Sequence, residues 1–262
     1  RQAAAARKGK PFMLYLSHTS PHKPVIPLKR FRGQGDAGAY GEFMIETDWH
    51  VGRVLDWLDE NKLADNTIVV FTSDNGPENT WRKRNEKFGH QSNGIYREGK
   101  RSIYEGGHRV PFLVRWPAKV KAGSRWEQPV CQTDLLATFA EMLSKNLPDN
   151  AGEDSVSFYR ALTGENAPQR LAMIHHGMQG RYAIREGQWK LIMEGGRRAA
   201  KRELYDLSAD PGEKNDLIAK HPKVAKRLAK RITEIIQNGR TTPGQPQPND
   251  TPPWKDLVWM VD

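Results

Sequence analysis

Two polar side chains stand directly after a short apolar run and have the chemistry to bind a divalent cation. The run is Thr67–Thr72, whose β-branched residues predict a buried strand, and Asp74 and Asn75 follow it. A carboxylate beside a carboxamide offers two hard oxygen atoms, which Ca²⁺ and Mg²⁺ prefer as ligands. Aspartate and asparagine before a glycine also form ordinary tight turns. Taken alone, the pair favours the turn.

A lysine and a histidine in two other loops could act on an anion. Lys100 stands near Gly99, Gly106 and Gly107, whose backbone can approach an anion closely. On its own such a lysine is more often a solvated surface charge. His22 lies in a loop that three prolines enforce after an apolar run. Ligands of a doubly wound sheet bind beyond the carboxyl ends of its strands, so loops that follow predicted strands are the candidate positions.

The hydrophobic pattern predicts alternating strands and helices in the first part of the chain. Apolar runs predict short strands buried on both faces at 11–16, 67–72 and 110–115. Apolar residues at helical spacing predict helices from Met44 to Leu58 and from Thr133 to Leu143. Residues 78–108 are polar and glycine-rich, which predicts a long irregular excursion. The alternation predicts an α/β fold with a mostly parallel sheet.

The pattern changes after about residue 165. Short strand candidates separated by glycine turns predict an antiparallel sheet, at 172–175, 182–185, 188–192 and 203–207. Pro222 begins a predicted helix whose apolar stripe runs from Val224 to Ile236. We therefore predict an α/β domain over 1–165, a small antiparallel α+β subdomain over 166–239 and a proline-rich tail over 240–262.

The composition excludes several classes of protein. Lysine and arginine number 41 and aspartate and glutamate 31, which gives a formal net charge of +10. No apolar run reaches the roughly 18 residues of a membrane span. The single Cys131 excludes an intrachain disulfide framework and a multi-cysteine zinc site. The densest basic stretch, 220–231, has no interleaved aromatic residues, which disfavours nucleic acid. The surplus positive charge is compatible with a sulfated or phosphorylated anionic substrate.

The order of the motifs identifies a resemblance that no single motif carries. The segments Ser20–Pro24, Phe71–Pro77, Gly89–Gly94 and Gly99–Pro117 follow one another in the sequence. Together they resemble the sulfatase family, of the arylsulfatase type. The most specific parts are the Asp-Asn-Gly-Pro turn and the Lys…Glu-Gly-Gly-x-Arg-Val-Pro block. The resemblance extends from about Pro11 to Asn238, with later landmarks at Asp134–Thr138, Ser155–Gly164 and Glu203–Glu213.

The resemblance implies an alkaline-phosphatase-like fold and a sulfuric ester hydrolase, acting on sulfated carbohydrate or a related anionic ester. Members of the family attack sulfur with a formylglycine hydrate and polarise the sulfate with a calcium ion. On the matching positions, Asp74 and Asn75 would bind the metal, Ca²⁺ rather than Mg²⁺, and Lys100 would contact the sulfate. His22 would contact the ester oxygen or the sulfate as a proton donor. Fixed positive charge and a metal suit a reaction in which negative charge develops.

The sequence departs from the family pattern in one respect that concerns the chemistry. Formylglycine is made from a cysteine or serine in a C/S-x-P-S-R motif, and residues 1–262 contain none. Cys131 lies in Pro-Val-Cys-Gln-Thr and does not match. The family's N-terminal Asp-Asp metal ligands also have no counterpart before Pro11. We therefore expect the chain to correspond to the C-terminal portion of a sulfatase, inactive by itself and a weak Ca²⁺ binder.

The remaining histidines allow structural as well as functional roles. His90 lies in the excursion and could contact substrate, or could form a structural hydrogen bond. His175 stands at a predicted strand end and could reach the cleft, although this is the less favoured of its two roles. For His108 we expect a structural role, with the neighbouring Arg109 paired inside the domain.

Two other functions stay open at this point. A metal-dependent phosphohydrolase of the same superfamily would use aspartate and histidine ligands differently. A non-catalytic polyanion-binding remnant would fit the missing nucleophile motif and the net charge of +10. By resemblance alone we expect a periplasmic or secreted location. The sequence predicts no oligomeric state.

Overall fold

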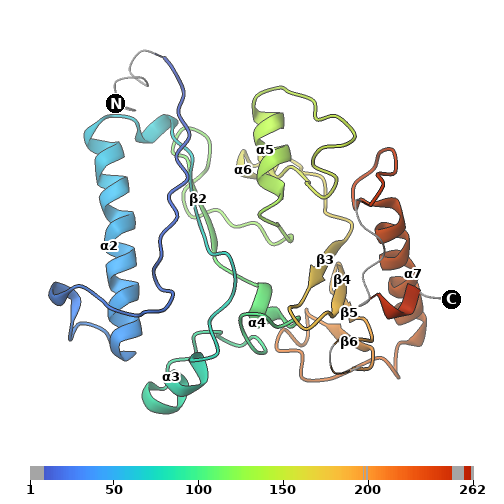
Figure 1. The fold of residues 1–262 in the computed structure, drawn as a ribbon. Helices are drawn as coiled ribbons and strands as arrows, with labels where there is room; N and C mark the ends of the chain where they lie inside the picture. Colours follow the sequence, from blue (N-terminus) through green and yellow to red (C-terminus); the bar gives the residue numbers. More distant parts are fainter. Residues whose placement is uncertain (1–8, 197, 199, 250–256, 261–262) are drawn as a thin grey trace. The chain divides into compact units, whose positions relative to one another are not determined.

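The computed structural model describes residues 9–196, 198, 200–249 and 257–260. The chain forms two compact units, each built from several stretches of sequence. Among the described residues, unit 1 contains 9–73, 77–92 and 111–122. Unit 2 contains 74–76, 93–110 and the described residues from 123 onward. Figure 1 shows the helices and strands of both units, coloured along the chain.

Unit 1 is built on one long helix and one pair of strands. Its elements are η1 (Lys29–Phe31), α2 (Gly38–Glu60), η2 (Ala64–Asn66), β1 (Val69–Thr72), α3 (Trp81–Phe88) and β2 (Phe112–Arg115). The helix predicted from Met44 is confirmed and begins six residues earlier, as 44 − 38 shows. Its predicted buried stripe is only partly right, because Met44 is exposed while Glu46, Thr47 and Leu58 are buried. Glu46 is buried because its carboxylate accepts the backbone N–H of Leu28 at 2.8 Å.

The strand predicted at 11–16 is wrong for the described structure. These residues form no strand, and Met13 and Tyr15 are 77% and 85% exposed. An apolar run becomes a strand buried on both faces only when neighbouring strands and covering helices are present. Within the described residues no strand pairs with this segment. The run has the residue types of a buried strand without the partners that such a strand needs.

The pairing direction of the other predicted strands also differs from the expectation. β1 pairs with β2 antiparallel, with Val69 opposite Arg115 and Thr72 opposite Phe112. Every strand pair among the described residues is antiparallel, so the parallel pairing predicted from the strand–helix alternation is not seen here. The connection from Ser73 to Pro111 is long enough to return the chain in either direction. Alternation in the sequence therefore does not fix strand direction.

The excursion predicted at 78–108 is less irregular than expected. It contains the eight-residue helix α3 in unit 1 and the four-residue helix α4 (Glu105–His108) in unit 2. Helix α3 has a strongly polar composition, and Gly89, with a positive φ of 67°, ends it. Such a glycine commonly follows a helix, because the left-handed conformation costs it little.

The antiparallel sheet of unit 2 confirms the prediction made from the four short runs. Its strands are β3 (Met173–His176), β4 (Tyr182–Glu186), β5 (Trp189–Ile192) and β6 (Glu203–Asp206), and each pairs with the next along the chain. The turn between β4 and β5 needs only two residues, since Glu186 lies opposite Trp189. Gly187 in this turn has a φ of 57°, which suits a tight hairpin turn.

Helix α7 (Pro222–Asn238) covers this sheet and forms the main hydrophobic core of unit 2 (Figure 1). The predicted stripe is confirmed: Leu228, Ile232 and Ile235 are buried. They pack with the sheet residues Ile184 and Leu191 in one cluster. Proline at the first helical position is preorganised for a helix start, and Gly239 ends the helix in the left-handed conformation.

Helices α5 (Asp134–Met142) and α6 (Tyr159–Leu162) form a second part of unit 2. The helix predicted from Thr133 to Leu143 is confirmed, but its predicted apolar face is wrong. Leu143 is 63% exposed, whereas Asp134 and Thr138 are buried. Asp134 is buried because its carboxylate accepts the backbone N–H groups of Cys131 and Val156, at 2.7 and 2.9 Å.

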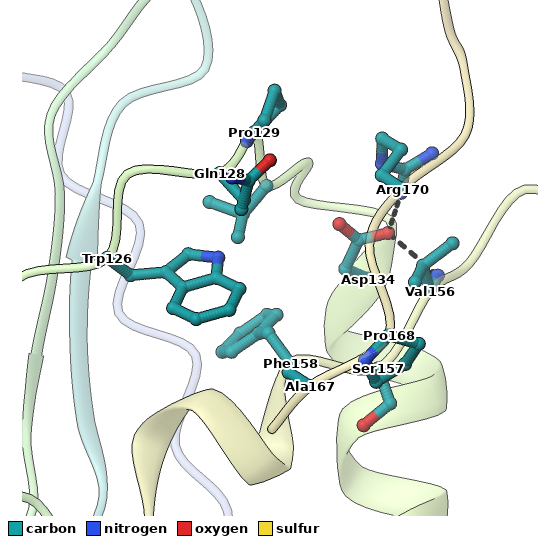
Figure 2. A pocket seen from close by; sticks show the side chains of 11 residues that line it. Trp126, Gln128, Pro129, Asp134, Val156, Ser157, Phe158, Ala167, Pro168 and Arg170 are labelled. Atoms are coloured by element: carbon teal, nitrogen blue, oxygen red, sulfur yellow. Dashed lines mark hydrogen bonds and ion pairs between the residues drawn. The ribbon is translucent and has the colours of Figure 1, made fainter. Parts of the chain in front are cut away.

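Asp134 also forms an ion pair with Arg170, at the edge of a small cavity (Figure 2). Figure 2 shows the Trp126 indole and the Phe158 ring on the other side of the cavity. The cavity volume of about 10 Å³ is close to the space that one water molecule needs. This cavity is therefore too small for an organic ligand.

The predicted domain boundaries at 165 and 239 stay a prediction. In the predicted tail, the Arg240 guanidinium donates to the Gln245 carbonyl at 2.8 Å. Residues 250–256 and 261–262 of that tail, and residues 1–8 of the predicted α/β domain, lie outside the described residues.

We expect the substitution Leu228→Ala to lower the free energy of unfolding of unit 2 by about 2–5 kcal/mol, because it leaves a cavity at a fully buried position. Urea unfolding measures this loss. The exposed Lys226→Ala on the same helix is the control and should change stability by less than about 0.5 kcal/mol. Equal effects of the two substitutions would contradict the assigned packing of α7.

Candidate functional site

The loop with Asp74 and Asn75 lies against the short helix α4 of unit 2. The Gly76 N–H donates to the Gly107 carbonyl at 3.1 Å. A Cβ placed on Gly76 would lie 1.8 Å from the Gly106 carbonyl oxygen, which leaves no room for a side chain. The backbone of Gly76 is therefore in direct contact with the two glycines of α4.

The turn with Lys100 lies against the same two glycines. A Cβ on Gly106 would lie 2.3 Å from the Glu98 carbonyl oxygen, and one on Gly107 would lie 2.4 Å from the Ser102 carbonyl oxygen. The turn itself closes through a hydrogen bond from the Ser102 N–H to the Gly99 carbonyl at 3.0 Å. Helix α4 thus contacts both Gly76, which follows Asp74 and Asn75 directly, and the turn that contains Lys100.

The donor atoms at Asp74 and Asn75 fit part of a site for a hard divalent cation. The Asp74 side chain is exposed and forms no hydrogen bond or ion pair within the described residues. The Asn75 amide nitrogen donates to the Gly76 carbonyl at 2.9 Å, which orients the side chain. Among the described residues no group of three or more His, Cys, Asp or Glu residues could hold a metal. Ca²⁺ takes six to eight oxygen ligands, so these two side chains supply only a part of them.

Lys100 has the properties of an anion contact. Its side chain is half-buried, and its ammonium forms no ion pair within the part of the chain described. Arg101 and Glu98 flank it with positive φ values of 75° and 61°, an uncommon conformation for side-chain-bearing residues. The Arg101 carbonyl accepts the N–H of Met178, which connects the turn to the β3–β4 hairpin.

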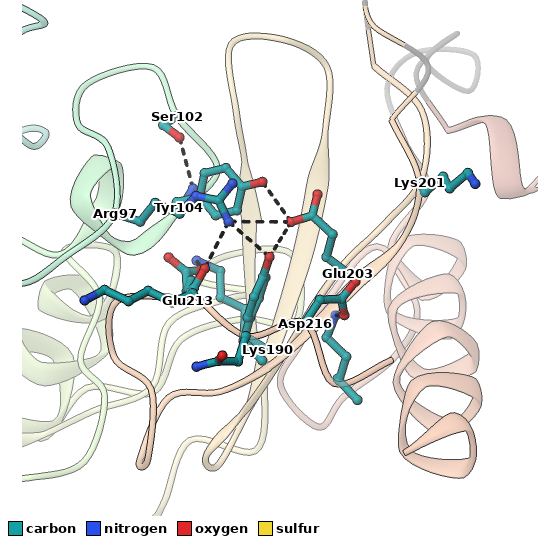
Figure 3. Close-up of polar contacts among 12 residues, drawn as sticks. Arg97, Ser102, Tyr104, Lys190, Lys201, Glu203, Glu213 and Asp216 are labelled. Atoms are coloured by element: carbon teal, nitrogen blue, oxygen red, sulfur yellow. Dashed lines mark hydrogen bonds and ion pairs between the residues drawn. The ribbon is translucent and has the colours of Figure 1, made fainter. Parts of the chain in front are cut away.

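A polar network holds both ends of the Lys100 turn to the antiparallel sheet (Figure 3). On one side, Arg97 donates to the Tyr205 hydroxyl at 3.1 Å and to the Glu213 carbonyl at 3.0 Å. On the other side, the Tyr104 hydroxyl donates to Glu203 at 2.8 Å. The Tyr205 hydroxyl donates to the same carboxylate at 2.6 Å. Figure 3 shows the side chains of Arg97, Tyr104 and Glu203 converging in this network.

The network fixes the protonation states of its members. Burial, followed by the hydrogen bond to Glu203, raises the pKa of Tyr104 to about 12. The same two causes raise the pKa of Tyr205 well above its ordinary value. Burial alone would raise the pKa of Glu203, but hydrogen bonds from Tyr205, Arg181 and Tyr104 outweigh it and hold this pKa below its ordinary value. Two neutral phenols therefore donate to one carboxylate.

A buried charge cluster joins α4 to strand β5. The Lys190 ammonium lies 3.0 Å from Glu105 Oε1 and 2.9 Å from Glu213 Oε1, and all three side chains are at most 3% exposed. The contact with Glu213 has ion-pair distance but not hydrogen-bond geometry. The other Glu213 oxygen accepts the Glu105 N–H at 2.6 Å, and Arg109 pairs with Glu105 at 2.9 Å. The expected pairing of Arg109 inside the domain is confirmed.

The two carboxyls of this cluster are shifted in opposite directions. Burial alone would raise the pKa of Glu105, but the charges of Lys190 and Arg109 outweigh it and lower this pKa to about 2. Burial raises the pKa of Glu213, and the charge of Lys190 and the hydrogen bond from the Glu105 N–H do not outweigh it. Glu105 is therefore the residue that stays ionised.

Glu105, Lys190 and Glu213 are not among the candidate residues predicted from the sequence. A signal for one of them was present, since Lys190 lies in a predicted strand between the apolar residues Trp189 and Leu191. A lysine is almost never fully buried unless it is paired. Its partner Glu105, however, lies 85 residues earlier in the sequence. Its partner Glu213 lies 23 residues later (213 − 190).

Two of the histidines of unit 2, His108 and His175, pack against each other. The ring centroids of His108 and His175 are 4.7 Å apart, and the Nε2 atoms of both are buried without a hydrogen-bond partner in the described residues. Burial, then the charge of Lys190, lowers the pKa of His108 to about 4 and that of His175 well below its ordinary value. Both imidazoles are therefore neutral near pH 7, and the expected structural role fits His108.

The remaining two candidates belong to unit 1. His22 is exposed, and its Nδ1 contacts the Lys23 carbonyl at 2.8 Å. His90 is exposed and lies 3.1 Å from the Ser92 hydroxyl, with its ring edge-on to that of Tyr40. Their roles at a common site stay a prediction.

Comparison with known proteins identifies the family. The sulfatase family model matches residues 1–145, and a second model, the C-terminal region of N-sulphoglucosamine sulphohydrolase, matches residues 94–238. The first covers more than half of the chain, so this chain belongs to the sulfatase family, as its motifs indicated.

The relatives include bacterial and human proteins. N-acetylgalactosamine-6-O-sulfatase of Bacteroides thetaiotaomicron is 37% identical over 246 residues, which cover 88% of this chain and 48% of that protein. Human steryl-sulfatase is 36% identical over 156 residues, 60% of this chain and 27% of that protein. A structure solved in work on the metabolism of multiple glycosaminoglycans by Bacteroides thetaiotaomicron is 35% identical, with a TM-score of 0.80 over 89% of this chain and 52% of that one.

These comparisons confirm the predicted fold class and the small antiparallel subdomain. The chain has the alkaline-phosphatase-like α/β fold of the solved sulfatases. It spans about half of the length of the bacterial relatives and about a quarter of the human one. Among the described residues no helix is both long and apolar enough to cross a membrane.

We expect the stability of unit 2 to fall as the pH is lowered from about 6.5 toward 4. The unfolded histidines take up protons in this range while His108 and His175 in the folded unit do not, so protons favour unfolding. The loss from His108 alone is on the order of 3 kcal/mol and levels off below its folded pKa of about 4. Urea unfolding at pH 7.5, 5.5 and 4.5 measures it.

The substitution His175→Phe keeps a ring against His108 but removes one titrating group, so it should flatten this pH dependence. His90→Gln, at an exposed position in unit 1, is the control and should leave the slope unchanged. An unchanged slope in the His175 variant would contradict the neutral, buried state of that imidazole.

Proposed function

We propose that the protein hydrolyses sulfate esters and that Asp74, Asn75 and Lys100 act at its reaction centre. The observation that carries the proposal is the packing of both segments on α4: Gly76, next to Asn75, and the turn at 97–102 contact the same two glycines. This packing supports the proposal, because one short element contacts both the segment with the two candidate cation ligands and the turn with Lys100, whose ammonium has no ion pair in the described residues. Membership of the sulfatase family supports the reaction class.

Each of these three side chains has a role that its chemistry supports. Asp74 and Asn75 provide oxygen ligands to a divalent metal, for which we propose Ca²⁺ rather than Mg²⁺. Ca²⁺ accepts varied oxygen ligands in a flexible geometry, whereas Mg²⁺ demands a near-ideal octahedron. The bound metal would polarise the sulfate. Lys100 neutralises charge on the sulfate oxygens, where a fixed cation is worth more than in water.

The three histidines have separate roles in the proposal. His22 contacts the sulfate or the ester oxygen and protonates the leaving oxygen. His90, which is exposed, contacts the substrate. His175 is a further candidate substrate contact; its support is weaker, because its Nε2 is buried in the described structure.

The nucleophile of the proposed reaction is formylglycine. Residues 1–262 contain no C/S-x-P-S-R motif, so the proposal requires a nucleophile from outside this stretch. The substrate class that we propose is a sulfated carbohydrate, since one relative is named for N-acetylgalactosamine-6-O-sulfate chemistry. A periplasmic or secreted location would suit such a substrate.

Two alternatives remain testable. A metal-dependent phosphohydrolase would share the fold, but such an enzyme needs more His and Asp ligands than the Asp74–Asn75 pair provides. A non-catalytic polyanion binder would use the net charge of +10 without a reaction. Assays of the full-length protein with an aryl sulfate and the matching aryl phosphate separate these functions. Turnover of the sulfate supports the proposal, and preference for the phosphate supports the phosphohydrolase. No turnover of either ester supports the non-catalytic polyanion binder.

We expect Lys100→Ala to lower kcat for 4-methylumbelliferyl sulfate about 10²–10³-fold in the full-length protein. Loss of one preorganised group that stabilises developing negative charge has an effect of this size. Steady-state kinetics measure it, with Lys226→Ala on the exposed face of α7 as the control of equal charge change. Full activity of the Lys100 variant would refute the role of this lysine.

Residues 1–262 by themselves should show no sulfatase turnover and should bind Ca²⁺ with a dissociation constant of about 1 mM or weaker, because two side-chain ligands are few for this ion. Isothermal titration calorimetry measures the binding, and Asp74→Ala should abolish it. Turnover of a simple aryl sulfate by this stretch alone would show that the assigned nucleophile is wrong.

A further inference from the structure

We propose that Lys190 is a positioning residue: from strand β5 it holds α4 in place, and through α4 it sets the positions of Lys100 and of the Asp74–Asn75 pair. The inference rests on the proposed function, because the positions of those three residues matter only if they act at the reaction centre. It differs from a catalytic role, since Lys190 is fully buried and does not reach substrate.

The first step is the attachment of α4 to the sheet. Lys190 lies between Glu105, the first residue of α4, and Glu213, in the loop that follows β6. Glu213 also accepts the backbone N–H of Glu105 at 2.6 Å. One ammonium and two carboxylates thus connect three segments that are distant in the sequence.

The second step is the contact between α4 and the candidate site. Gly106 and Gly107 follow Glu105 directly and touch both residues 74–76 and the Lys100 turn. These contacts are between backbone atoms with no room for a side chain, so no flexible group can absorb a displacement of α4. A shift of Glu105 would therefore move both loops.

The third step is the independent attachment of the Lys100 turn to the same sheet. Arg97 and Tyr104, on either side of the turn, bond to residues of β6 and of the loop after it. The Arg101 carbonyl accepts an N–H from the β3–β4 hairpin. The antiparallel sheet thus serves as the support of the turn.

The fourth step concerns the energetic cost of the cluster. Burying an ammonium and two carboxyls removes them from water, and such groups can often be replaced by apolar side chains without loss of stability. Stability alone therefore does not account for Lys190. The hydrogen bond of Lys190 to Glu105, together with its ion pair to Glu213, does account for it, because these contacts fix the position of Glu105 in a way that apolar packing would not.

The test compares three variants of the full-length protein. Lys190→Met removes the ammonium. Lys190→Met with Glu213→Gln removes it without an unpaired buried charge, because Glu105 keeps Arg109 and the new amide oxygen can still accept the Glu105 N–H. Arg170→Met is the matched control, since it breaks a buried ion pair with Asp134 in the same unit. Within the described residues, Arg170 forms no hydrogen bond or ion pair with α4 or with the Lys100 turn.

We expect both Lys190 variants to lower kcat for 4-methylumbelliferyl sulfate about 10–100-fold with KM changed less than about threefold, because a misplacement of about 1 Å at a reaction centre has an effect of this size. The Ca²⁺ dissociation constant, measured by calorimetry with the metal alone, should rise by at least about threefold. Amide hydrogen exchange should accelerate at residues 99–107 and stay unchanged at 225–235 of α7. The control should change none of these.

The outcomes separate the two claims. If the Lys190→Met/Glu213→Gln variant folds and keeps both kcat and Ca²⁺ affinity, or if Arg170→Met causes the same losses, the positioning role is refuted. If the unmodified protein does not hydrolyse aryl sulfate, the proposed function fails. The hydrogen-exchange comparison then still decides whether Lys190 positions residues 99–107.

Discussion

The candidate site depends on a close approach of backbones at Gly76, Gly106 and Gly107. At each of these positions a Cβ would lie within 2.4 Å of a carbonyl oxygen, and backbone atoms cannot move away as a flexible side chain could. Residues 74–76 and 98–102 can therefore lie against α4 only while all three positions remain glycine. The segments that carry Asp74, Asn75 and Lys100 therefore meet α4 at residues that have no side chains.

The antiparallel sheet of unit 2 has two faces with different tasks. One face packs on α7 through Ile184, Leu191 and neighbouring apolar residues, and this hydrophobic core stabilises the sheet. Lys190, next to Leu191 in the same strand, points to the other face, because successive side chains of a strand alternate. There it meets Glu105 and Glu213. A sheet made rigid by its core can thus hold a polar site on its opposite side.

The sequence predicted those features that depend on neighbouring residues. The four strands of unit 2 and helix α7 follow from local periodicity, and Gly187 and Gly239 mark their turns and ends. The absence of a strand at 11–16 in the described structure and the direction of β1 relative to β2 could not be predicted, because pairing depends on distant segments. The same applies to the site. The motif order grouped Asp74, Asn75 and Lys100, but the ion cluster joins residues up to 108 positions apart, and a lysine inside a predicted strand does not indicate which residues pair with it.

The charge balance around α4 adds a reason why an anion would be stabilised near Lys100. Three cations surround the Glu105 carboxylate: Lys190, Arg109 and, at 3.8 Å, Arg185. Burial raises the pKa of Glu213, which weakens the second negative charge of the cluster. The neutral His108 and His175 contribute no charge near pH 7, because burial and the cations lower the pKa of both. The cluster therefore carries net positive charge beside α4, whose glycines contact the Lys100 turn. Charge that is partly buried is screened less than charge in water, so this field would favour the sulfate contact that we propose for Lys100.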